Sequence, residues 1–277
     1  MQNCKYNKSL IKKNDFYKWY ICDRCGLINN KIIKDQKYFQ STKNKLFNNK
    51  NSTNKFELEN FYSNNIKKLS LKKKIIWFDY GCGNGDSLFF FKKIGFKNVY
   101  GYEPNQQRRN NCINKGINVV PKLNDIKKNN DVIFVRNVFD YVENFPQLIK
   151  FFSNRLKNNG HLIIIDKIYN NKKRKINIYS DFNSSLIFRN VLFKETFIYH
   201  LKINKFKLIK IRTNFNGRIE IIAKKQKKKI SINNQINDMK TLIKTIKYEI
   251  KFKYIYIFKY EILNIAFKFY KILKKIK

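Results

Sequence analysis

Three glycines and an acid at the end of an apolar run have the clearest chemical meaning in this sequence. The run IIWF (75–78) leads into Asp79, and Gly81, Gly83 and Gly85 follow at every second position. Glycine has no Cβ, so it adopts positive φ readily and lets a ligand approach the main chain closely. The spacing therefore predicts a tight turn after a buried strand, where a nucleotide-like ligand binds in an open parallel sheet.

The acids around this turn favour a ligand without phosphates. A dinucleotide-binding turn has the spacing G-x-G-x-x-G and places the pyrophosphate on a helix N-terminus. Here Asp86 stands at the third glycine of that fingerprint, and Asp79 precedes the first glycine by two residues. Two carboxylates at this place would repel a pyrophosphate. We therefore expect a cationic ligand.

A further acid, Glu103, ends the strand-like segment NVYGYE (98–103). A carboxylate at this strand end can accept hydrogen bonds from both hydroxyls of a ribose. S-adenosylmethionine has a ribose and a sulfonium, contains no phosphate, and carries an ammonium group that suits nearby acids. The residues around the turn therefore predict S-adenosylmethionine as the ligand.

The same residues carry a resemblance to a known family. The segments FDYGCGNGDSL (78–88) and VYGYEPN (99–105) resemble the class I S-adenosylmethionine-dependent methyltransferases. The likeness continues through residues 130–166 and covers roughly 75 to 225. It implies that the acid before the glycines, the glycines and the ribose acid bind the cofactor, which here are Asp79, Gly81, Gly83, Gly85 and Glu103.

The resemblance also assigns positions nearer to the methyl acceptor. Asp125 stands where some members contact the adenine, and Asn137 is expected near the sulfur of the methyl donor. Asp140 is the candidate general base, although many similar sugar and small-molecule methyltransferases have Glu-His at that place. For Asp125 and Asp140, an acid that only faces solvent is the alternative interpretation. Of the two histidines, His161 is interpreted as a surface residue at the start of a strand, and His200, at the end of a helix, as a residue without a catalytic role.

The elements that must position these residues alternate between strand-like and helix-like segments, as in an α/β layered sheet. Strands are expected at 74–80, 98–103, 117–120, 131–137, 161–168, 206–213 and 218–225. Helices are expected at 86–95, 105–116, 144–160 and 184–204. NFNG (214–217) joins the last two strands as a hairpin.

The predicted fold class is therefore α/β, with a Rossmann-like, doubly wound, seven-stranded sheet that ends in an antiparallel hairpin. We expect three parts: an irregular lead-in resembling a degenerate zinc ribbon (1–45), a methyltransferase domain (46–225) and a basic amphipathic helical tail (226–277). In the tail, apolar residues recur at helical spacing, and lysines occupy the other faces. This helix could bind an anionic membrane surface or pack against protein.

The cysteines of the lead-in leave two interpretations open. Cys22-x-x-Cys25 followed by Gly26 has the shape of a zinc knuckle, and the lead-in resembles that of many sugar and glycan methyltransferases. A structural zinc normally has four nitrogen or sulfur ligands. Cys4 lacks its own partner, because Asn7 stands where the second cysteine would be, so only three thiols are available. The lead-in is either a zinc site or a vestigial ribbon without metal.

The net charge of +41 also has two interpretations. It could attract an anionic partner such as nucleic acid, or it could reflect a composition biased toward Lys, Asn, Ile, Phe and Tyr. The lysines are spread along the whole chain, which favours the second interpretation. An odd number of cysteines, five, and no apolar leader predict a cytoplasmic protein, peripheral at the membrane if the tail binds there.

The expected activity is S-adenosylmethionine-dependent O-methylation of a sugar, a glycan intermediate or a small hydroxylated metabolite. Nucleic-acid amino methylation is disfavoured, because RNVF (136–139) replaces the Asn/Asp-Pro-Pro-aromatic motif of that class. Cytosine methylation is disfavoured too, because no cysteine stands next to a proline. An RNA-directed methyltransferase and a non-catalytic binding module are the alternatives.

Overall fold

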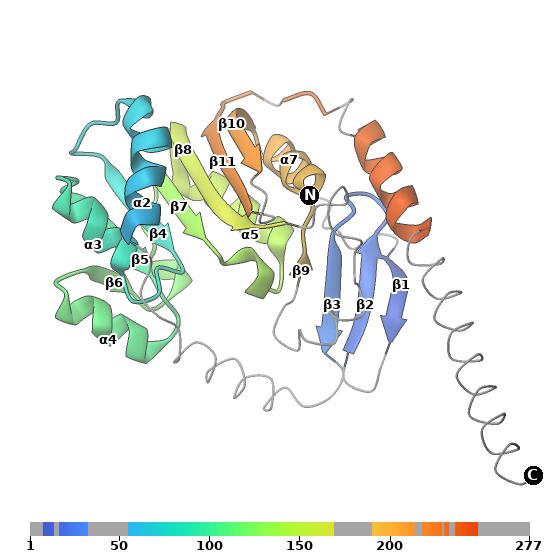
Figure 1. Ribbon diagram of the computed structural model, residues 1–277, viewed down its shortest axis with the longest axis horizontal. Helices are drawn as coiled ribbons and strands as arrows, with labels where there is room; N and C mark the ends of the chain where they lie inside the picture. The colour runs from blue at the N-terminus through green and yellow to red at the C-terminus, as the bar shows by residue number, and fades with distance from the viewer. Residues whose placement is uncertain are drawn as a thin grey trace, which may run out of the picture.

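A large α/β sheet and a small second sheet form the described part of the chain (Figure 1). The computed structural model describes residues 8–13, 17–32, 55–168, 190–213, 218–228, 230–232 and 236–248. The large sheet has seven strands in the order β10-β11-β8-β7-β4-β5-β6. Their bounds are β4 Ile76–Tyr80, β5 Asn98–Tyr102, β6 Asn118–Val120, β7 Asn130–Arg136, β8 Leu156–Lys167, β10 Phe206–Thr213 and β11 Arg218–Lys225.

The direction of the strands confirms the predicted sheet. β4 lies parallel to both β5 and β7, and β8 lies parallel to β7. β11 runs antiparallel to β8 and to β10, which is the closing hairpin. The chain builds outward from β4 through β5 to β6 and then crosses to β7 on the other side of β4. Ligands bind at such a reversal, beyond the carboxyl ends of the strands.

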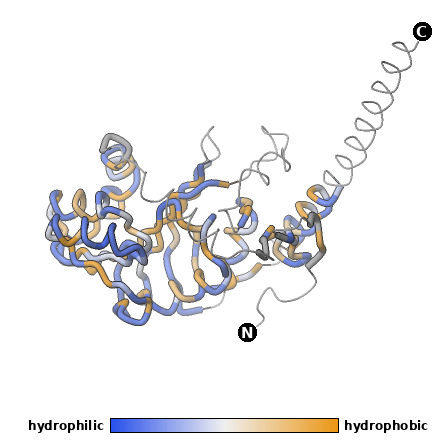
Figure 2. The backbone as a smooth tube through the Cα atoms, turned by 90° about the horizontal axis from the view of Figure 1, so that it is seen from below, coloured by the Kyte–Doolittle hydropathy of each residue, from blue (hydrophilic) through white to orange (hydrophobic). Residues whose placement is uncertain are grey.

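Both faces of the large sheet are covered by apolar side chains, because successive residues of a strand point to opposite faces. In β4, Trp77 packs with Phe91 of α3 on one face, whereas Phe78 belongs to the cluster on the other face, which includes Phe152 of α5. All four side chains are fully buried. In the hydropathy view, apolar stretches alternate with polar ones along the backbone (Figure 2).

The helices fall close to their expected positions, with two differences. Their bounds are α2 Lys55–Phe61, α3 Asp86–Lys93, α4 Gln106–Asn114, α5 Phe145–Arg155 and α7 Lys194–Ile203. The prediction that one helix runs over 144–160 was wrong at its end, because the backbone becomes extended at Leu156, which pairs with Asn130. Of the helix expected at 184–204, residues 184–189 lie outside the described part; Asn190–Val191 form strand β9, and α7 begins at Lys194.

The N-terminal lead-in is not irregular, which corrects the prediction for this segment. β1 (Lys8–Lys13), β2 (Tyr17–Cys22) and β3 (Ile28–Ile32) form an antiparallel sheet, and β9 joins it beside β3. We call these four strands the accessory sheet. Because β9 follows β8 in the chain, its pairing with β3 joins the N-terminal strands to a segment that is distant from them in the sequence.

A helix formed by residues 236–248 covers the accessory sheet. Met239, Ile243 and Ile246 are buried, and the latter two share a cluster with Trp19 of β2. Lys247 forms an ion pair of 2.6 Å with Asp23. This part of the predicted tail therefore packs against protein, and residues 249–277 lie outside the described part. Within the described ranges, no helix has the length and apolar character needed to cross a membrane.

Truncation of Ile246 tests this docking. Its side chain is 0% exposed, so Ile246→Ala should lower the free energy of unfolding by about 2–4 kcal/mol through lost burial and a residual cavity. Chemical denaturation of the full chain measures the change. Tyr248→Ala is the control, because Tyr248 is 63% exposed and should have a much smaller effect. Equal effects of the two variants would contradict the docked helix.

Candidate functional site

The glycine loop after β4 leaves one stretch of main chain open to a ligand. Gly81, Gly83 and Gly85 all have positive φ, at 73°, 60° and 76°. A Cβ on Gly81 would lie 2.7 Å from Cγ2 of Val138, so the packing of the protein itself requires that glycine. A Cβ on Gly83 would meet only the Nη1 atom of Arg108, at 3.9 Å. Gly83 is therefore the position where a ligand could lie against the backbone.

Glu103 lies directly beside this open backbone. Because β5 pairs in parallel with β4, the residue after β5 reaches the same level as the glycine loop. The Gly83 N–H donates to Oε2 of Glu103 at 3.0 Å, and the Asn105 N–H donates to Oε1 at 2.9 Å. Glu103 as a whole is 5% exposed. Two backbone donors thus fix its orientation, while each oxygen can accept a further hydrogen bond from a ligand hydroxyl.

Asp79 is buried beneath the glycine loop. Its Oδ2 accepts a hydrogen bond from the Ser87 hydroxyl, which ties the end of β4 to the first turn of α3. Burial raises the pKa of Asp79 to about 6, and the charge of Glu103 adds to this, whereas Ser87 and the guanidinium of Arg136 oppose it. Asp79 is therefore poised to respond to any cation that binds above it.

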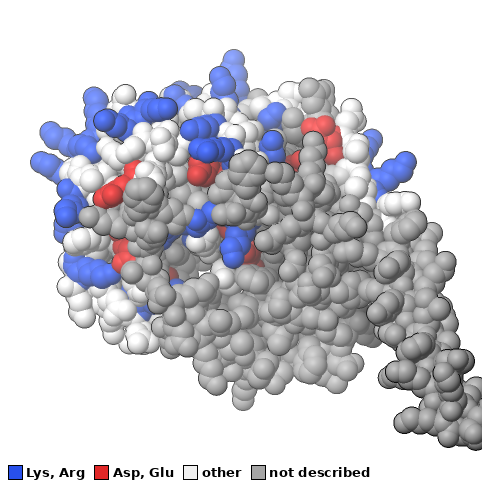
Figure 3. Space-filling view, in the orientation of Figure 1, with Lys and Arg blue, Asp and Glu red and all other residues white. Residues whose placement is uncertain are grey.

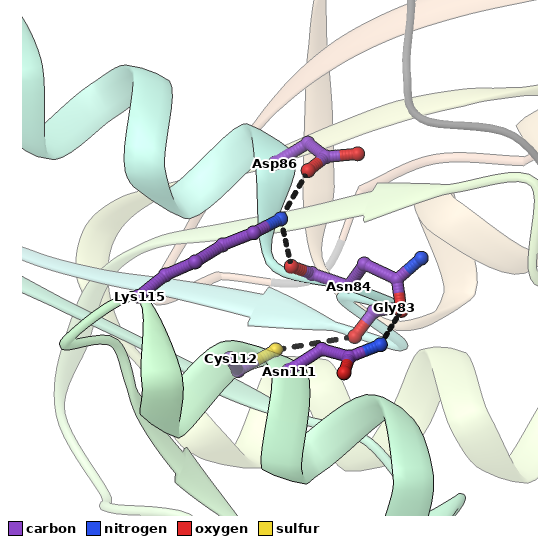
Figure 4. A network of polar contacts seen from close by, with 6 residues as sticks. All are labelled: Gly83, Asn84, Asp86, Asn111, Cys112 and Lys115. Atoms are coloured by element: carbon purple, nitrogen blue, oxygen red, sulfur yellow. Dashed lines mark hydrogen bonds and ion pairs between the residues drawn. The ribbon is translucent and has the colours of Figure 1, made fainter.

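Asp86 does not contribute a free negative charge, which weakens one step of the sequence argument. Lys115 of the α4 end forms an ion pair of 2.7 Å with Asp86 and donates to the carbonyl of Asn84 at 2.9 Å (Figure 4). Cys112 of α4 donates to the carbonyl of Gly83 at 3.2 Å. These contacts hold the loop from its outer side. The expectation of a cationic ligand therefore depends on Asp79 and Glu103 and not on Asp86.

The loop after β7 approaches the glycine loop from the other side. Asn137 adopts a positive φ of 52°, and its N–H donates to the carbonyl of Ile165 at 2.9 Å. Its side-chain Oδ1 accepts from Nη2 of Arg218 at 3.3 Å. Val138, the next residue, is the one whose side chain packs against Gly81. Asn137 therefore lies just beyond the carboxyl end of β7, and its place near the sulfur of the methyl donor stays a prediction.

A buried carboxylate that the sequence argument missed holds this loop. Oδ2 of Asp166 accepts from the N–H groups of Val138 and Phe139 at 2.9 and 3.0 Å, and Oδ1 accepts from the Lys167 N–H at 2.8 Å. Burial raises the pKa of Asp166 to about 6 against these stabilising bonds. The signal was present, because HLIIID (161–166) ends an apolar run in an acid just as IIWFD (75–79) does.

Asn190 of β9 holds the same loop through its carbonyl groups. The buried side-chain amide donates to the carbonyls of Phe139 and Val142 at 2.8 and 2.6 Å. Its oxygen accepts from the amide of Asn29 in β3 at 3.1 Å. The accessory sheet is therefore fastened to the loop after β7. No local pattern in the sequence indicates these contacts, because they join residues more than forty positions apart.

Asp140 lies in this fastened loop, within the short helix Phe139–Tyr141. Its side chain is half-buried. Burial raises the pKa of the neighbouring Tyr141 to about 12, and the charges of Asp140 and Asp166 add to that effect. Asp125 is exposed in another short helix, Leu123–Asp125, after β6. Both acids thus lie beyond carboxyl ends of strands, with Asp140 beside β7 and Asp125 at the far edge.

The cysteines of the lead-in are buried, and the zinc prediction remains a prediction. Cys22 and Cys25 belong to the core cluster, and Gly26 closes their turn with an N–H donated to the carbonyl of Cys22 at 2.9 Å. Cys4 lies outside the described residues. Among those that are described, no three His, Cys, Asp or Glu side chains gather as a metal site. His200 is also buried, and burial lowers its pKa to about 4.

Comparisons with known proteins agree with this geometry. Residues 56–183 match a family model described as "Methyltransferase domain". The geranyl diphosphate C-methyltransferase of Streptomyces coelicolor A3(2) is 11% identical, with a TM-score of 0.55 over 69% of this chain and 100% of that one. The magnesium protoporphyrin IX methyltransferase of Synechocystis PCC 6803 is 15% identical, with a TM-score of 0.51 over 68% and 96%. No curated protein matches the sequence significantly.

The different surroundings of two glycines give a paired prediction. Gly83→Ala adds a methyl group into open space, so it should cost about 1–2 kcal/mol in left-handed backbone strain but abolish measurable binding of S-adenosylmethionine. Gly81→Ala adds the same strain plus a clash with Val138, so it should destabilise the fold further. Thermal unfolding and calorimetric titration separate the two effects. A Gly83→Ala protein with unchanged affinity would show that the ligand lies elsewhere.

Proposed function

We propose that this chain, an S-adenosylmethionine-dependent methyltransferase, methylates an oxygen atom of a small hydroxylated acceptor such as a sugar or a glycan intermediate. The family match and the fold support the methyltransferase class and the methyl donor. The residues present also fit that donor. Gly83 leaves room for a nucleoside against the main chain, and Glu103 presents a fixed carboxylate for its ribose hydroxyls.

Each part of the carboxyl edge has a role in this proposal. When bound, S-adenosylmethionine supplies an electrophilic methyl carbon on a sulfonium sulfur. Asp79 stabilises positive charge above the end of β4, and Asn137 lies beside the place of transfer at the end of β7. Asp140 accepts the proton that the acceptor hydroxyl releases. The main contribution of the protein is to align the acceptor oxygen with the methyl carbon, at roughly 3 Å.

The attachment of the accessory sheet is the observation that favours a small acceptor. Asn190 fastens that sheet to the loop carrying Asp140, so the accessory sheet borders this part of the carboxyl edge. A small molecule fits such an edge better than a folded polymer does. On the face seen in Figure 3, Lys and Arg side chains occur at several separate places along the upper and left parts of the described surface.

The ribose assignment can be tested by calorimetry. Glu103→Gln keeps the shape of the side chain but removes its charge and one acceptor, so affinity for S-adenosylmethionine and for S-adenosylhomocysteine should fall about tenfold to a hundredfold. Titration of the wild type and the variant with both compounds measures this. Glu59→Gln, an exposed acid on α2, is the matched control and should bind as the wild type does. Equal affinity in Glu103→Gln would remove the assignment.

The raised pKa of Asp79 predicts how binding depends on pH. With a pKa of about 6, the carboxyl group is mostly charged at pH 7 and mostly neutral at pH 5. If the charged form binds the cationic cofactor, affinity should weaken by about tenfold between those pH values. Asp79→Asn should bind weakly at both, with a flat profile. A wild-type profile as flat as that of the variant would exclude this role.

The raised pKa of Asp79 also determines how the stability of the fold depends on pH. The pKa of Asp79 is raised on folding, so the folded protein holds the proton more tightly than the unfolded chain does. The contribution of Asp79 to stability is therefore fully present below its ordinary pKa of 3.8 and is lost as the pH rises through about 6. Weaker binding below pH 6 thus cannot be attributed to unfolding caused by protonation of Asp79.

A further inference from the structure

Two thiols meet beneath the glycine loop. Cys82 lies within the loop, between Gly81 and Gly83, and Cys112 belongs to α4. Neither is in a disulfide, both are buried, and both belong to the same apolar cluster. The thiol of Cys82 donates a hydrogen bond to the sulfur of Cys112, so the two side chains are in contact although they come from different elements.

Glycines make room for both sulfur atoms. A Cβ on Gly101 of β5 would lie 2.7 Å from Sγ of Cys82, and a Cβ on Gly85 would lie 2.9 Å from Sγ of Cys112. Both distances are too short for real contacts, so a side chain at either glycine would displace a thiol. The third glycine of the loop therefore serves the packing of Cys112, whereas Gly83 is the one that leaves the main chain open.

The two thiols are connected to the backbone of the proposed ribose site. Sγ of Cys112 donates to the carbonyl of Gly83 at 3.2 Å (Figure 4). The N–H of Gly83 donates to the carboxylate of Glu103, and the N–H of Cys82 donates to the carbonyl of Tyr102 at 3.1 Å. A change in the bonding between the two sulfur atoms therefore acts on both peptide groups of Gly83.

The two thiols differ in acidity. The hydrogen bond from Cys82 lowers the pKa of Cys112, and the ammonium group of Lys115 acts in the same direction, whereas burial and the nearby acids oppose them. The same hydrogen bond, together with burial, raises the pKa of Cys82. A thiolate is the nucleophilic form of cysteine, and a neighbouring thiol converts the sulfenic acid that a peroxide produces into a disulfide. The pair thus has one sulfur suited to attack and a second suited to closing the disulfide.

The cofactor position lies on the side from which the pair can be reached. Cys82 is 9% exposed and Cys112 is 0% exposed, so the remaining access to the pair is at Cys82. Cys82 is bonded directly to Gly83, where the space above the main chain is open. A small oxidant would therefore approach from the side on which the nucleoside is proposed to lie. A bound cofactor should cover this route.

We propose that Cys82 and Cys112 are a redox modification site, at which a peroxide forms a disulfide that weakens the binding of S-adenosylmethionine. The thiolate of Cys112 attacks one oxygen of hydrogen peroxide and becomes a sulfenic acid, and the released hydroxide takes up the proton that Cys112 has lost. The thiol of Cys82 then displaces water from that sulfur. Two thiols and one hydrogen peroxide thus give one disulfide and two water molecules.

The disulfide would change the glycine loop in two ways. It draws the sulfur atoms to about 2 Å from each other, which is much closer than a hydrogen bond between thiols. It also removes the hydrogen that Cys112 donates to the carbonyl of Gly83. The regulatory role rests on the proposed function, whereas formation of the disulfide does not.

Peptide mapping of the full chain tests the disulfide. The protein is treated with hydrogen peroxide, its remaining thiols are blocked with iodoacetamide, and it is digested with trypsin. Cys82 falls in peptide 75–92 and Cys112 in peptide 110–115, so their disulfide gives a linked pair of peptides that dithiothreitol separates. The link should form, and S-adenosylhomocysteine should slow its formation. If these two peptides stay unlinked when the protein is oxidised without cofactor, the proposal is overturned.

Calorimetric titration with S-adenosylhomocysteine tests the consequence of the disulfide. The affinity of the wild type should fall about tenfold or more after peroxide treatment and return with dithiothreitol. Cys112→Ser keeps a donor for the carbonyl of Gly83 but cannot form the disulfide, so its affinity should be the same before and after peroxide. This variant also controls for oxidation of the methionines, which it retains.

Two results would overturn the regulatory role: a linked wild type with undiminished affinity, or an equal loss of affinity in Cys112→Ser. A reduced wild type that does not bind S-adenosylhomocysteine would instead contradict the proposed function. The peptide map decides in that case whether the disulfide forms, because it does not depend on cofactor binding.

Discussion

The hydrogen bond from the Gly83 N–H to the Glu103 carboxylate is the contact on which the site depends. It joins the turn after β4 to the end of β5, and it exists only because the two strands pair in parallel and end at the same level. The bond leaves the carboxylate oriented and able to accept more hydrogen bonds. It also keeps the main chain at Gly83 in the left-handed conformation that leaves the space above it open.

In the loop after β7, by contrast, side chains from other elements bind both the N–H groups and the carbonyl groups of the backbone. Asp166 accepts from its N–H groups, and Asn190 donates to its carbonyls. A buried loop needs partners for its polar backbone groups. Here those partners come from the end of β8 and from the accessory sheet. The position of Asp140 is therefore fixed by two elements outside the loop, and the accessory sheet is attached to the carboxyl edge of the large sheet.

The carboxyl edge carries charges of both signs. Asp79 and Glu103 lie at the ends of β4 and β5, and Arg109 and Arg136 lie near them. Lys167 and Arg218 stand on opposed positions of β8 and β11, next to the buried carboxylate of Asp166.

The sequence by itself determined where the main features stand along the chain. These are a glycine turn after an apolar run, an acid after the next strand, and a hairpin at the end. These features are local, so residue types and spacing within a few positions are enough to predict them. Only the tertiary structure decided the roles of Asp166 and Asn190, because each acts across strands or sheets on residues distant in the chain. It also decided that Lys115 neutralises Asp86, and that the lead-in forms a sheet with β9. Contacts between distant segments leave no local pattern, since their geometry exists only after the strands have paired.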